Sequence, residues 1–324
     1  MLIDAHIHYV GDHPKTIEWM TENDVKLLNL CVAHEPGEGW RDQAARYSKI
    51  AKDYPDRYAW CTSFSLPDFK DDDYADKVIA GLAADVADGA IGCKLWKNIG
   101  MIEKKPDGQF LQIDDPIFTP IFDFMTAEEI PIVMHLAEPL ECWQPLGENN
   151  SMTRYYTTHP EYHMYGRDDY PHHSVIMAAR DNLVARHPKA RFIGAHLASL
   201  EYDVKEIAAR FEQFPNFAVD TCGPARIVSL GKQNRDEVRE FFIKYAGRIM
   251  YGSDRSTKGQ LELSDEELAE SLASLTDTFA QGLDYYGTDK EMSIKGYGFI
   301  GLDLPEDAME KLFATSAKSW YPGL

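Results

Sequence analysis

The feature that most constrains this chain is a regular alternation of short apolar runs with longer amphipathic segments. Eight apolar runs occur along the sequence, and each is followed by a segment with helical spacing. Such alternation predicts parallel strands joined by right-handed crossovers. Eight units in one chain fit a closed (β/α)8 TIM barrel better than an open sheet. The expected strands are Leu2–His8, Lys26–Ala33, Arg57–Ser65, Ala90–Trp96, Ile130–Leu136, Arg191–His196, Asn216–Thr221 and Arg248–Ser253.

The segments between these runs carry recognisable helix starts. Asp115 precedes a proline at the first helical position, and Ser264 with Glu267 has the spacing of a capping box. No glycine- or serine-rich linker divides the sequence, so we expect a single domain over residues 1–324. The expected helices are Thr16–Glu22, Arg41–Asp53, Tyr74–Asp88, Pro116–Glu128, Ser174–Arg186, Val204–Phe214, Arg235–Ala246 and Asp265–Tyr286, with an extra C-terminal helix at Pro305–Trp320.

The longest interruption of this pattern is Ala137–His173, between the fifth strand and its helix. Loops longer than ~15 residues are usually functional or disordered. The tryptophan, tyrosine, histidine and charged residues in this stretch favour function. Two interpretations stay open: a lid over a site at the barrel mouth, or a loop packed by its own aromatic side chains.

Composition excludes several classes of protein. The chain has 33 Lys and Arg against 53 Asp and Glu, a formal net charge of −20. A sequence-independent nucleic-acid binder needs a basic face, so no nucleic-acid partner is expected. No run approaches the ~18 apolar residues of a membrane span, and the N-terminus has no signal-peptide pattern. The five cysteines form no Cys-x-x-Cys pair, so we expect a reduced cytoplasmic protein without a membrane partner.

Potential metal ligands stand at the ends of four expected strands. His6 and His8 close the first strand, and residues two apart in a strand share a face. His135 ends the fifth strand, His196 ends the sixth and Asp254 follows the eighth. The carboxyl ends of barrel strands form the catalytic face of this fold. Four imidazoles and a carboxylate meeting there predict a site for a divalent metal, with Zn²⁺ expected first and Mn²⁺ or Fe²⁺ as alternatives.

This arrangement resembles the ligand pattern of the amidohydrolase superfamily and is most similar to its amidohydrolase-related (amidohydrolase 2) branch. That branch contains hydrolases, decarboxylases and hydratases. The resemblance extends over nearly the whole chain and implies a metal-dependent enzyme in which Asp254 also transfers protons. The residues that match the pattern are Asp4, His6, His8, His135, His196 and the Gly252-Ser253-Asp254 run.

Lys94, on the fourth expected strand, leaves the number of metal ions open. Binuclear members of the superfamily carry a carboxylated lysine here, and a buried lysine with a lowered pKa could react with CO₂. An unmodified Lys94 could instead bind a substrate carboxylate. We favour one ion over two, so Lys94 is a metal ligand only if it is carboxylated.

The ligand set predicts hydrolysis of an amide, ester or lactone in a small, carboxylate-bearing substrate. A metal with an open position lowers the pKa of bound water toward ~7. Asp254 can take the proton from that water and pass it to the leaving group, and His196 can assist if it is not itself a ligand. The alternative is a lyase, a non-oxidative decarboxylase or hydratase that uses the same site. A third possibility is a barrel that has lost catalysis and serves as a binding protein.

Several further residues are candidates for binding the substrate. They are Lys94, Arg154, His34, His159 and Arg226. His34 ends the second expected strand, where a substrate contact and loop packing are equally good interpretations. An arginine near an acidic residue is more often a structural ion pair, which applies to Arg226. A homodimer is possible as a general expectation for soluble enzymes.

Overall fold

The computed structural model describes residues 1–8, 11–33, 37–148, 150–256 and 263–324. All eight expected strands are present and pair in parallel, in the orders β1-β2-β3 and β4-β5-β6-β7-β8. They are shorter than expected, because turns begin earlier than the apolar runs end. The strands are β1 (Leu2–Ile7), β2 (Val25–Leu30), β3 (Tyr58–Cys61), β4 (Cys93–Leu95), β5 (Ile132–Met134), β6 (Phe192–Gly194), β7 (Phe217–Asp220) and β8 (Ile249–Met250).

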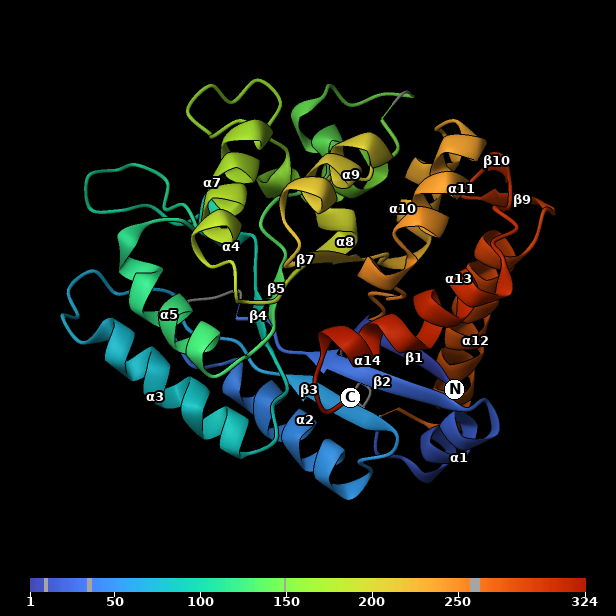
Figure 1. The fold of residues 1–324 in the computed structure, drawn as a ribbon, viewed down its shortest axis with the longest axis horizontal. Helices are drawn as coiled ribbons and strands as arrows, with labels where there is room; N and C mark the ends of the chain where they lie inside the picture. Colours follow the sequence, from blue (N-terminus) through green and yellow to red (C-terminus); the bar gives the residue numbers. More distant parts are fainter. Residues whose placement is uncertain (9–10, 34–36, 149, 257–262) are drawn as a thin grey trace.

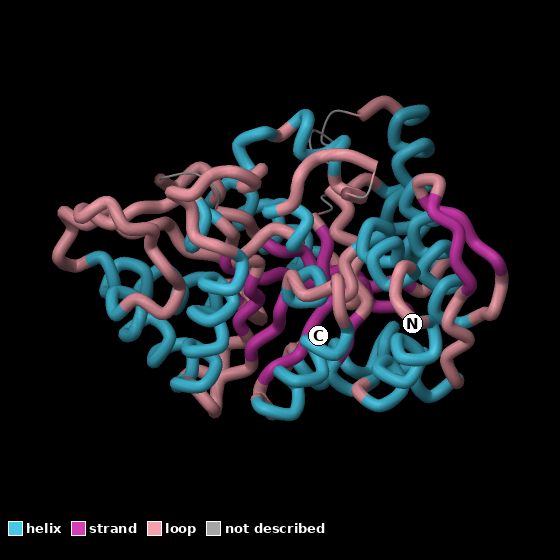
Figure 2. The backbone as a smooth tube through the Cα atoms, turned by 90° about the horizontal axis from the view of Figure 1, so that it is seen from above, coloured by secondary structure: helices cyan, strands magenta, loops and turns pink. Residues whose placement is uncertain are grey.

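Backbone hydrogen bonds join the two sheets at both seams. Between β3 and β4, Thr62 N–H donates to Gly92 O at 2.9 Å, and Lys94 N–H donates to Thr62 O at 2.7 Å. Between β8 and β1, Ala5 N–H donates to Tyr251 O at 2.9 Å, and a parallel bridge continues this seam. The eight strands therefore close into the expected barrel, with helices around it (Figures 1 and 2).

Helices form the outer layer of the molecule (Figure 1). Their starts follow local capping: the Asn234 side chain accepts from the backbone at the start of α11, and the capping box of Ser264 and Glu267 forms as expected. The helices up to the eighth crossover are α1 (Pro14–Glu22), α2 (Arg41–Asp53), α3 (Tyr74–Ala87), α4 (Asn98–Met101), α5 (Thr119–Ala127), α7 (His173–Arg186), α8 (Ala195–Ala198), α9 (Val204–Gln213), α10 (Gly223–Gly231), α11 (Arg235–Lys244) and α12 (Asp265–Gly287).

The long stretch after β5, which we call the insertion (residues 137–172), is not a plain loop. It holds a 3-10 turn at Leu140–Trp143, helix α6 (Thr153–Thr158) and a second 3-10 turn at Pro160–Tyr162. Aromatic side chains pack within it: the rings of Tyr155 and Tyr156 lie 5.3 Å apart. The insertion thus combines local aromatic packing with a position over the barrel mouth.

The C-terminal segment forms the expected extra helix in three pieces. These are α13 (Glu306–Glu310), a π-helical turn (Lys311–Thr315) and α14 (Ser316–Trp320). Ala317 and Tyr321 pack into the barrel interior. An antiparallel hairpin of β9 (Glu291–Ile294) and β10 (Tyr297–Ile300) precedes this segment and was not expected from the sequence.

The barrel interior follows the alternation of the strands, and this places the rim residues. Val133 faces the interior two residues before His135, and Ala218 does so two residues before Asp220. His135 and Asp220 therefore continue the inward-facing positions to the rim. In the described part of the chain, no helix has both the length and the apolar character needed to cross a bilayer. The single-domain organisation stays a prediction.

Candidate metal centre and its cavity

A cavity of about 260 Å³ lies at the carboxyl ends of the strands. It brings together every metal-ligand candidate of the sequence analysis, two of the five substrate-binding candidates and several residues of the insertion. Its lining consists of His6, His8, Lys94, Trp96, Lys97, His135, Glu138, Met152, Tyr155, His196, Arg226 and Asp254.

A register shift in β1 turns its histidines into this cavity. Ile3 and Ala5 face the barrel interior, so strict alternation would turn Ile7 inward and both histidines outward. The pairing of β1 with β2 shifts between Asp4 and Ile7, and Ile7 packs outside the barrel. Irregularities of this kind re-aim side chains beside active sites. The expectation that His6 and His8 share a face is confirmed, and the shift decides which face.

His6 is held by a buried carboxylate. Its Nδ1 lies 2.8 Å from Asp220 Oδ2, so Nδ1 carries the proton and Nε2 keeps a free electron pair. Asp220 Oδ1 accepts from the backbone N–H of His196 at 2.8 Å. Burial alone would raise the pKa of Asp220, but His6, His196 and Lys94 lower it to about 2. This carboxylate therefore stays ionised and orients two elements of the site.

His8 and Asp254 complete one side of the cluster. His8 Nδ1 donates to Leu30 O at 2.7 Å, which leaves its Nε2 facing Asp254 Oδ1 at 3.5 Å. The same carboxylate lies 3.5 Å from His6 Nε2 and 3.4 Å from His196 Nε2. Burial opposes ionisation of Asp254, but the three imidazoles, His196 first, lower its pKa well below the usual value. Asp254 is thus an anion surrounded by three imidazole rings.

His135 and His196 lie side by side at the bottom of the cavity, with ring centroids 4.2 Å apart. Both Nε2 atoms are buried, and within the described residues neither forms a hydrogen bond, although His196 Nε2 lies 3.4 Å from Asp254 Oδ2. Burial lowers the pKa of both residues well below that of an exposed histidine. Two neutral imidazoles with unpartnered buried nitrogens are costly unless something binds there.

His196 sits in a strained turn. The residues His196, Leu197, Ala198 and Ser199 have φ values of 58°, 54°, 60° and 56°. A left-handed backbone costs roughly 1–2 kcal/mol per residue for side chains of this kind. A Cβ on Gly194 would lie 2.5 Å from the Ala198 Cβ, so the turn also requires glycine at the end of β6. Strain of this size persists where the surrounding structure fixes it, commonly at functional sites.

Arg226 connects His196 to a buried acid. Its Nη2 lies 3.0 Å from His196 Nδ1, and its Nε lies 3.0 Å from Glu201 Oε1. Burial raises the pKa of Glu201 to about 7 although Arg226 opposes this. Burial alone would lower the pKa of Arg226, but Glu201 and the other acidic groups around it together raise that pKa. The guanidinium therefore stays charged, paired on one side and in contact with the imidazole on the other.

Two lysines line the cavity in different states. Lys97 pairs with Glu138 and lies over the Tyr162 ring at 3.7 Å. Lys94 is 1% exposed, and its Nζ lies 3.0 Å from His6 Nε2. Burial lowers the pKa of Lys94, with Asp220 opposing. Lys97 is thus neutralised locally, whereas Lys94 points its amine at the histidine cluster.

The donor set fits a divalent cation. Donor atoms of His6, His196, Cys222 and Asp254 lie within 4.8 Å of one another, and the unpartnered Nε2 of His135 adds a further imidazole. Neutral imidazoles with one ionised carboxylate suit Zn²⁺, Mn²⁺ or Fe²⁺. Cys222 was not anticipated: its Sγ lies 3.0 Å from His6 Nδ1, the side of the ring that faces away from Asp254.

The remaining substrate candidates lie apart from the cavity lining. Arg154 is exposed on α6, whereas its neighbours Met152 and Tyr155 line the cavity. His159 is exposed and stacks on Tyr155, with ring centroids 4.5 Å apart. His34 lies outside the described residues.

Sequence reasoning missed the residues that hold the cluster from behind. Asp220 and Glu201 supply the buried carboxylates, and Glu138 neutralises Lys97. Asp220 had a usable signal, because it ends an apolar strand as the histidines do. Glu201 and Glu138 had none, since each follows a strand in an irregular segment.

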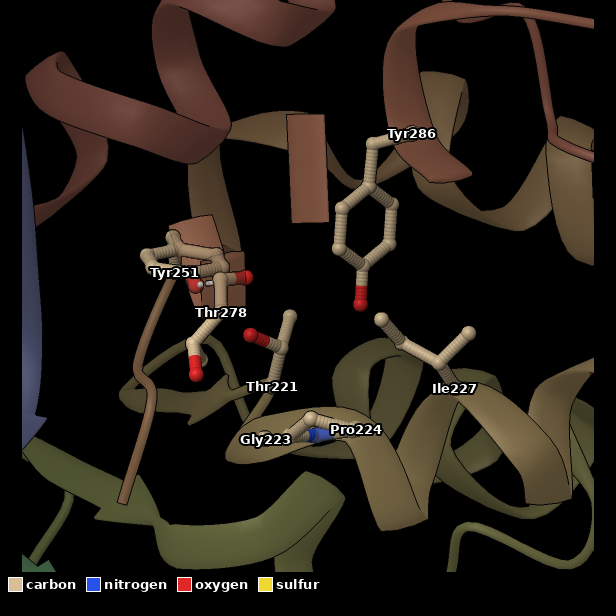
Figure 3. Close-up of a pocket in the computed structure, with 7 residues that line it drawn as sticks. All are labelled: Thr221, Gly223, Pro224, Ile227, Tyr251, Thr278 and Tyr286. Atoms are coloured by element: carbon tan, nitrogen blue, oxygen red, sulfur yellow. Dashed lines mark hydrogen bonds between the residues drawn. The ribbon is translucent and has the colours of Figure 1, made fainter. Parts of the chain in front are cut away.

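A second cavity, of about 10 Å³, lies between α10, α12 and β8 (Figure 3). The Tyr286 hydroxyl points toward Thr221 and Ile227. This space has the size of one water molecule and is lined by other residues than the histidine cavity.

Comparisons with known proteins agree with this fold. No match was found among curated proteins. A 2,6-dihydroxybenzoate decarboxylase from Rhizobium is 17% identical, with a TM-score of 0.52 over 96% of this chain and 88% of that one. A 4-oxalomesaconate hydratase from Rhodopseudomonas palustris is 13% identical, with a TM-score of 0.51 over 100% and 96% of the two chains.

A dihydroxybenzoic acid decarboxylase from Polaromonas, solved with manganese and the inhibitor 2-nitroresorcinol, is 13% identical, with a TM-score of 0.51 over 97% and 86% of the chains. At these identities the likeness shows a shared fold. The family model named Amidohydrolase (Amidohydro_2) matches residues 3–323. The chain therefore belongs to this amidohydrolase family.

Proposed function

We propose that this protein is a metal-dependent hydrolase that cleaves an amide, ester or lactone in a small, carboxylate-bearing substrate. The observation that carries the proposal is the cluster of imidazoles around the ionised Asp254 in the cavity at the strand ends. Such a cluster suits a divalent ion and a nearby proton acceptor together.

The position of the ring proton in each histidine indicates which nitrogen could bind a metal. His6 and His8 each donate through Nδ1 to an oxygen, so in the neutral ring Nε2 carries the electron pair that can bind a metal. The unpartnered Nε2 of His135 and the Asp254 carboxylate complete the proposed set. Zn²⁺ is the first expectation for these ligands, with Mn²⁺ or Fe²⁺ as alternatives.

His196 receives a different role. A guanidinium only donates hydrogen bonds, so the contact with Arg226 Nη2 makes His196 Nδ1 an acceptor. The proton of the neutral ring then resides on Nε2, which faces Asp254 and the cavity. A protonated Nε2 cannot bind a metal, so we place His196 as a hydrogen-bond donor to the substrate rather than as a ligand.

In the proposed hydrolysis, Asp254 transfers protons and His196 stabilises the developing negative charge. A divalent ion held by the proposed ligands supplies Lewis acidity and acidifies water at neutral pH. Asp254, ionised and 37% exposed, takes the proton from the attacking water and delivers it to the leaving group. His196 Nε2–H donates to the carbonyl oxygen as negative charge develops there.

Cations at the cavity support a substrate with a carboxylate. We propose that Lys94 stays an unmodified ammonium and, with Arg226, binds that carboxylate, so that the site holds one ion. Arg154 and His159 stay predicted substrate residues, at the outer side of α6.

A lyase is the second candidate. The structures similar in fold include two decarboxylases and a hydratase, whose names contain those of carboxylic acids. The same carboxylate and imidazole could protonate carbon instead of a leaving group. The products separate the candidates, because decarboxylation releases CO₂ and hydration cleaves no bond.

The test is a product assay on protein reconstituted with Zn²⁺ or Mn²⁺. The panel contains carboxylate-bearing amides, esters and lactones, and 2-hydroxybenzoates for the lyase reaction. The proposal expects a new acid with an amine or alcohol, and Asp254→Ala without activity. Release of CO₂ alone would overturn hydrolysis in favour of the lyase. The cytoplasmic location, the possible homodimer and the lack of nucleic-acid and membrane partners stay predictions.

A further inference from the structure

The strained turn that carries His196 is tied to both ends of the insertion at one residue. Ser199 Oγ donates to Ala137 O at 2.6 Å, and His173 Nε2 donates to Ser199 O at 2.9 Å. Ala137 is the first residue of the insertion, and His173 begins α7 directly after it. A single serine, 3% exposed, therefore joins the points where the insertion leaves and re-enters the barrel.

A second contact from α7 holds the same turn. Arg180 Nη1 donates to Ala198 O at 2.7 Å, and the buried guanidinium pairs with Asp181 at 2.8 Å. Two consecutive carbonyls of the turn thus accept hydrogen bonds from α7. Because four left-handed residues in a row are unfavourable by themselves, such contacts are what maintain the turn.

The insertion also forms part of the cavity wall. Glu138, Met152 and Tyr155 of the insertion line the cavity together with the imidazole. The distance between this wall and His196 is set by the segments that connect them. Ser199 is one of those connections, since it bonds to the insertion and lies three residues from His196.

We propose that Ser199 is a positioning residue that holds His196 in a fixed relation to the insertion. Ser199 does not line the cavity, so it acts through the turn. The proposal rests on the proposed role of His196 as the donor to the substrate carbonyl. Because Ser199 links the two, we expect the substrate to contact the insertion and His196 at the same time.

The experiment compares Ser199→Ala and Ser199→Gly with Ser48→Ala. Ser48 is a matched control: it is also 3% exposed, and its hydroxyl donates to Asp88 O on another element, far from the cavity. Glycine adopts a φ of 56° without strain, so Ser199→Gly should fold even if Ser199→Ala does not. The readouts are the ¹⁵N resonances of the His196 ring, assigned with His196→Gln, and hydrogen exchange of the insertion amides.

We expect both Ser199 variants to shift the His196 resonances and to speed exchange of the insertion amides about tenfold. On a substrate found by the product assay, kcat should fall about tenfold to a hundredfold, with KM within about twofold. Ser48→Ala should change none of these readouts. Unchanged resonances and unchanged exchange in both Ser199 variants would overturn the proposal. If the wild type turns over no substrate of the panel while both Ser199 variants show the expected resonance and exchange changes, the hydrolase proposal is refuted and the positioning role of Ser199 is supported.

Discussion

The two walls of the cavity differ in what holds their side chains. The strand-end wall carries His6, His135 and Asp254 on barrel strands or directly after them, and buried partners such as Asp220 fix their rings. The insertion wall carries Glu138 shortly after β5, Met152 just before α6 and Tyr155 on α6. The polar side chains of this six-residue helix are mostly exposed. The fold fixes the geometry of the strand-end wall. The sequence of the insertion wall can change without disturbing the barrel.

The largest effect is expected on the strand-end wall, at Asp254. The substitution Asp254→Asn keeps the shape but removes the ionised oxygen that faces three imidazoles. Loss of a positioned proton-transfer group should lower kcat/KM by at least about 10³-fold. Steady-state assays on the reconstituted enzyme test this, with the exposed Asp307→Asn as the control. Activity within tenfold of wild type would remove Asp254 from the mechanism.

The next effect concerns the buried pair behind His196. Arg226→Met removes the donor to His196 Nδ1 and leaves Glu201 buried without its cation. We expect a loss of about 10²-fold in kcat and of about 3 kcal/mol in the free energy of unfolding.

The double variant Arg226→Met with Glu201→Gln separates the two consequences. It should recover most of the stability, because no buried charge is left unpaired, without recovering the activity. Urea denaturation beside kinetics measures both quantities. Recovery of activity in the double variant would mean that the guanidinium acts only through stability.

A pH effect is expected at His173, where the insertion meets the barrel. Burial lowers the pKa of His173 from 6.5 to about 4. Below pH 6.5 the unfolded chain takes up a proton that the folded state refuses, so stability falls until about pH 4. The full loss amounts to about 3 kcal/mol.

His173→Gln keeps a donor for Ser199 O but does not titrate. The variant should lose less stability than wild type between pH 7 and pH 4.5, which urea denaturation at both pH values measures. Equal losses in the two proteins would place the acid sensitivity elsewhere.

The smallest effect is expected on the insertion wall. His159 is exposed directly after α6, and its ring contacts Tyr155 of that helix. His159→Ala should change stability by less than about 0.5 kcal/mol and KM by less than about twofold. A KM raised tenfold would show that His159 binds substrate, as the sequence analysis expected, and would weaken the contrast between the walls.

The same contrast explains how much could be read from the sequence. His135 was predictable because it continues the inward positions of its strand, two residues after Val133. The β1 and β6 histidines reach the cavity through a register shift and a left-handed turn, so the alternation alone could not fix their direction. The barrel could be predicted because the strands and helices that build it each show their own periodicity in the sequence.

Elements without periodicity were missed. The β9–β10 hairpin is short and joins through Lys295 and Gly296, where a lysine takes the φ of 53° that asparagine or glycine usually adopts. Helix α10 begins at Gly223-Pro224, which resembles a turn in sequence. Glu201 pairs with Arg226 across 25 residues of sequence, and no local pattern encodes such a contact.

The central claim is that the strand-end residues hold one divalent ion. Elemental analysis of protein purified without chelator tests it most directly, on wild type, Lys94→Met and His135→Ala. The account predicts about one equivalent of metal per chain in wild type and Lys94→Met, and far less in His135→Ala. Two equivalents that fall in Lys94→Met would contradict the single-ion site and indicate a carboxylated lysine. A wild-type chain that binds no metal even after reconstitution would contradict the account as a whole.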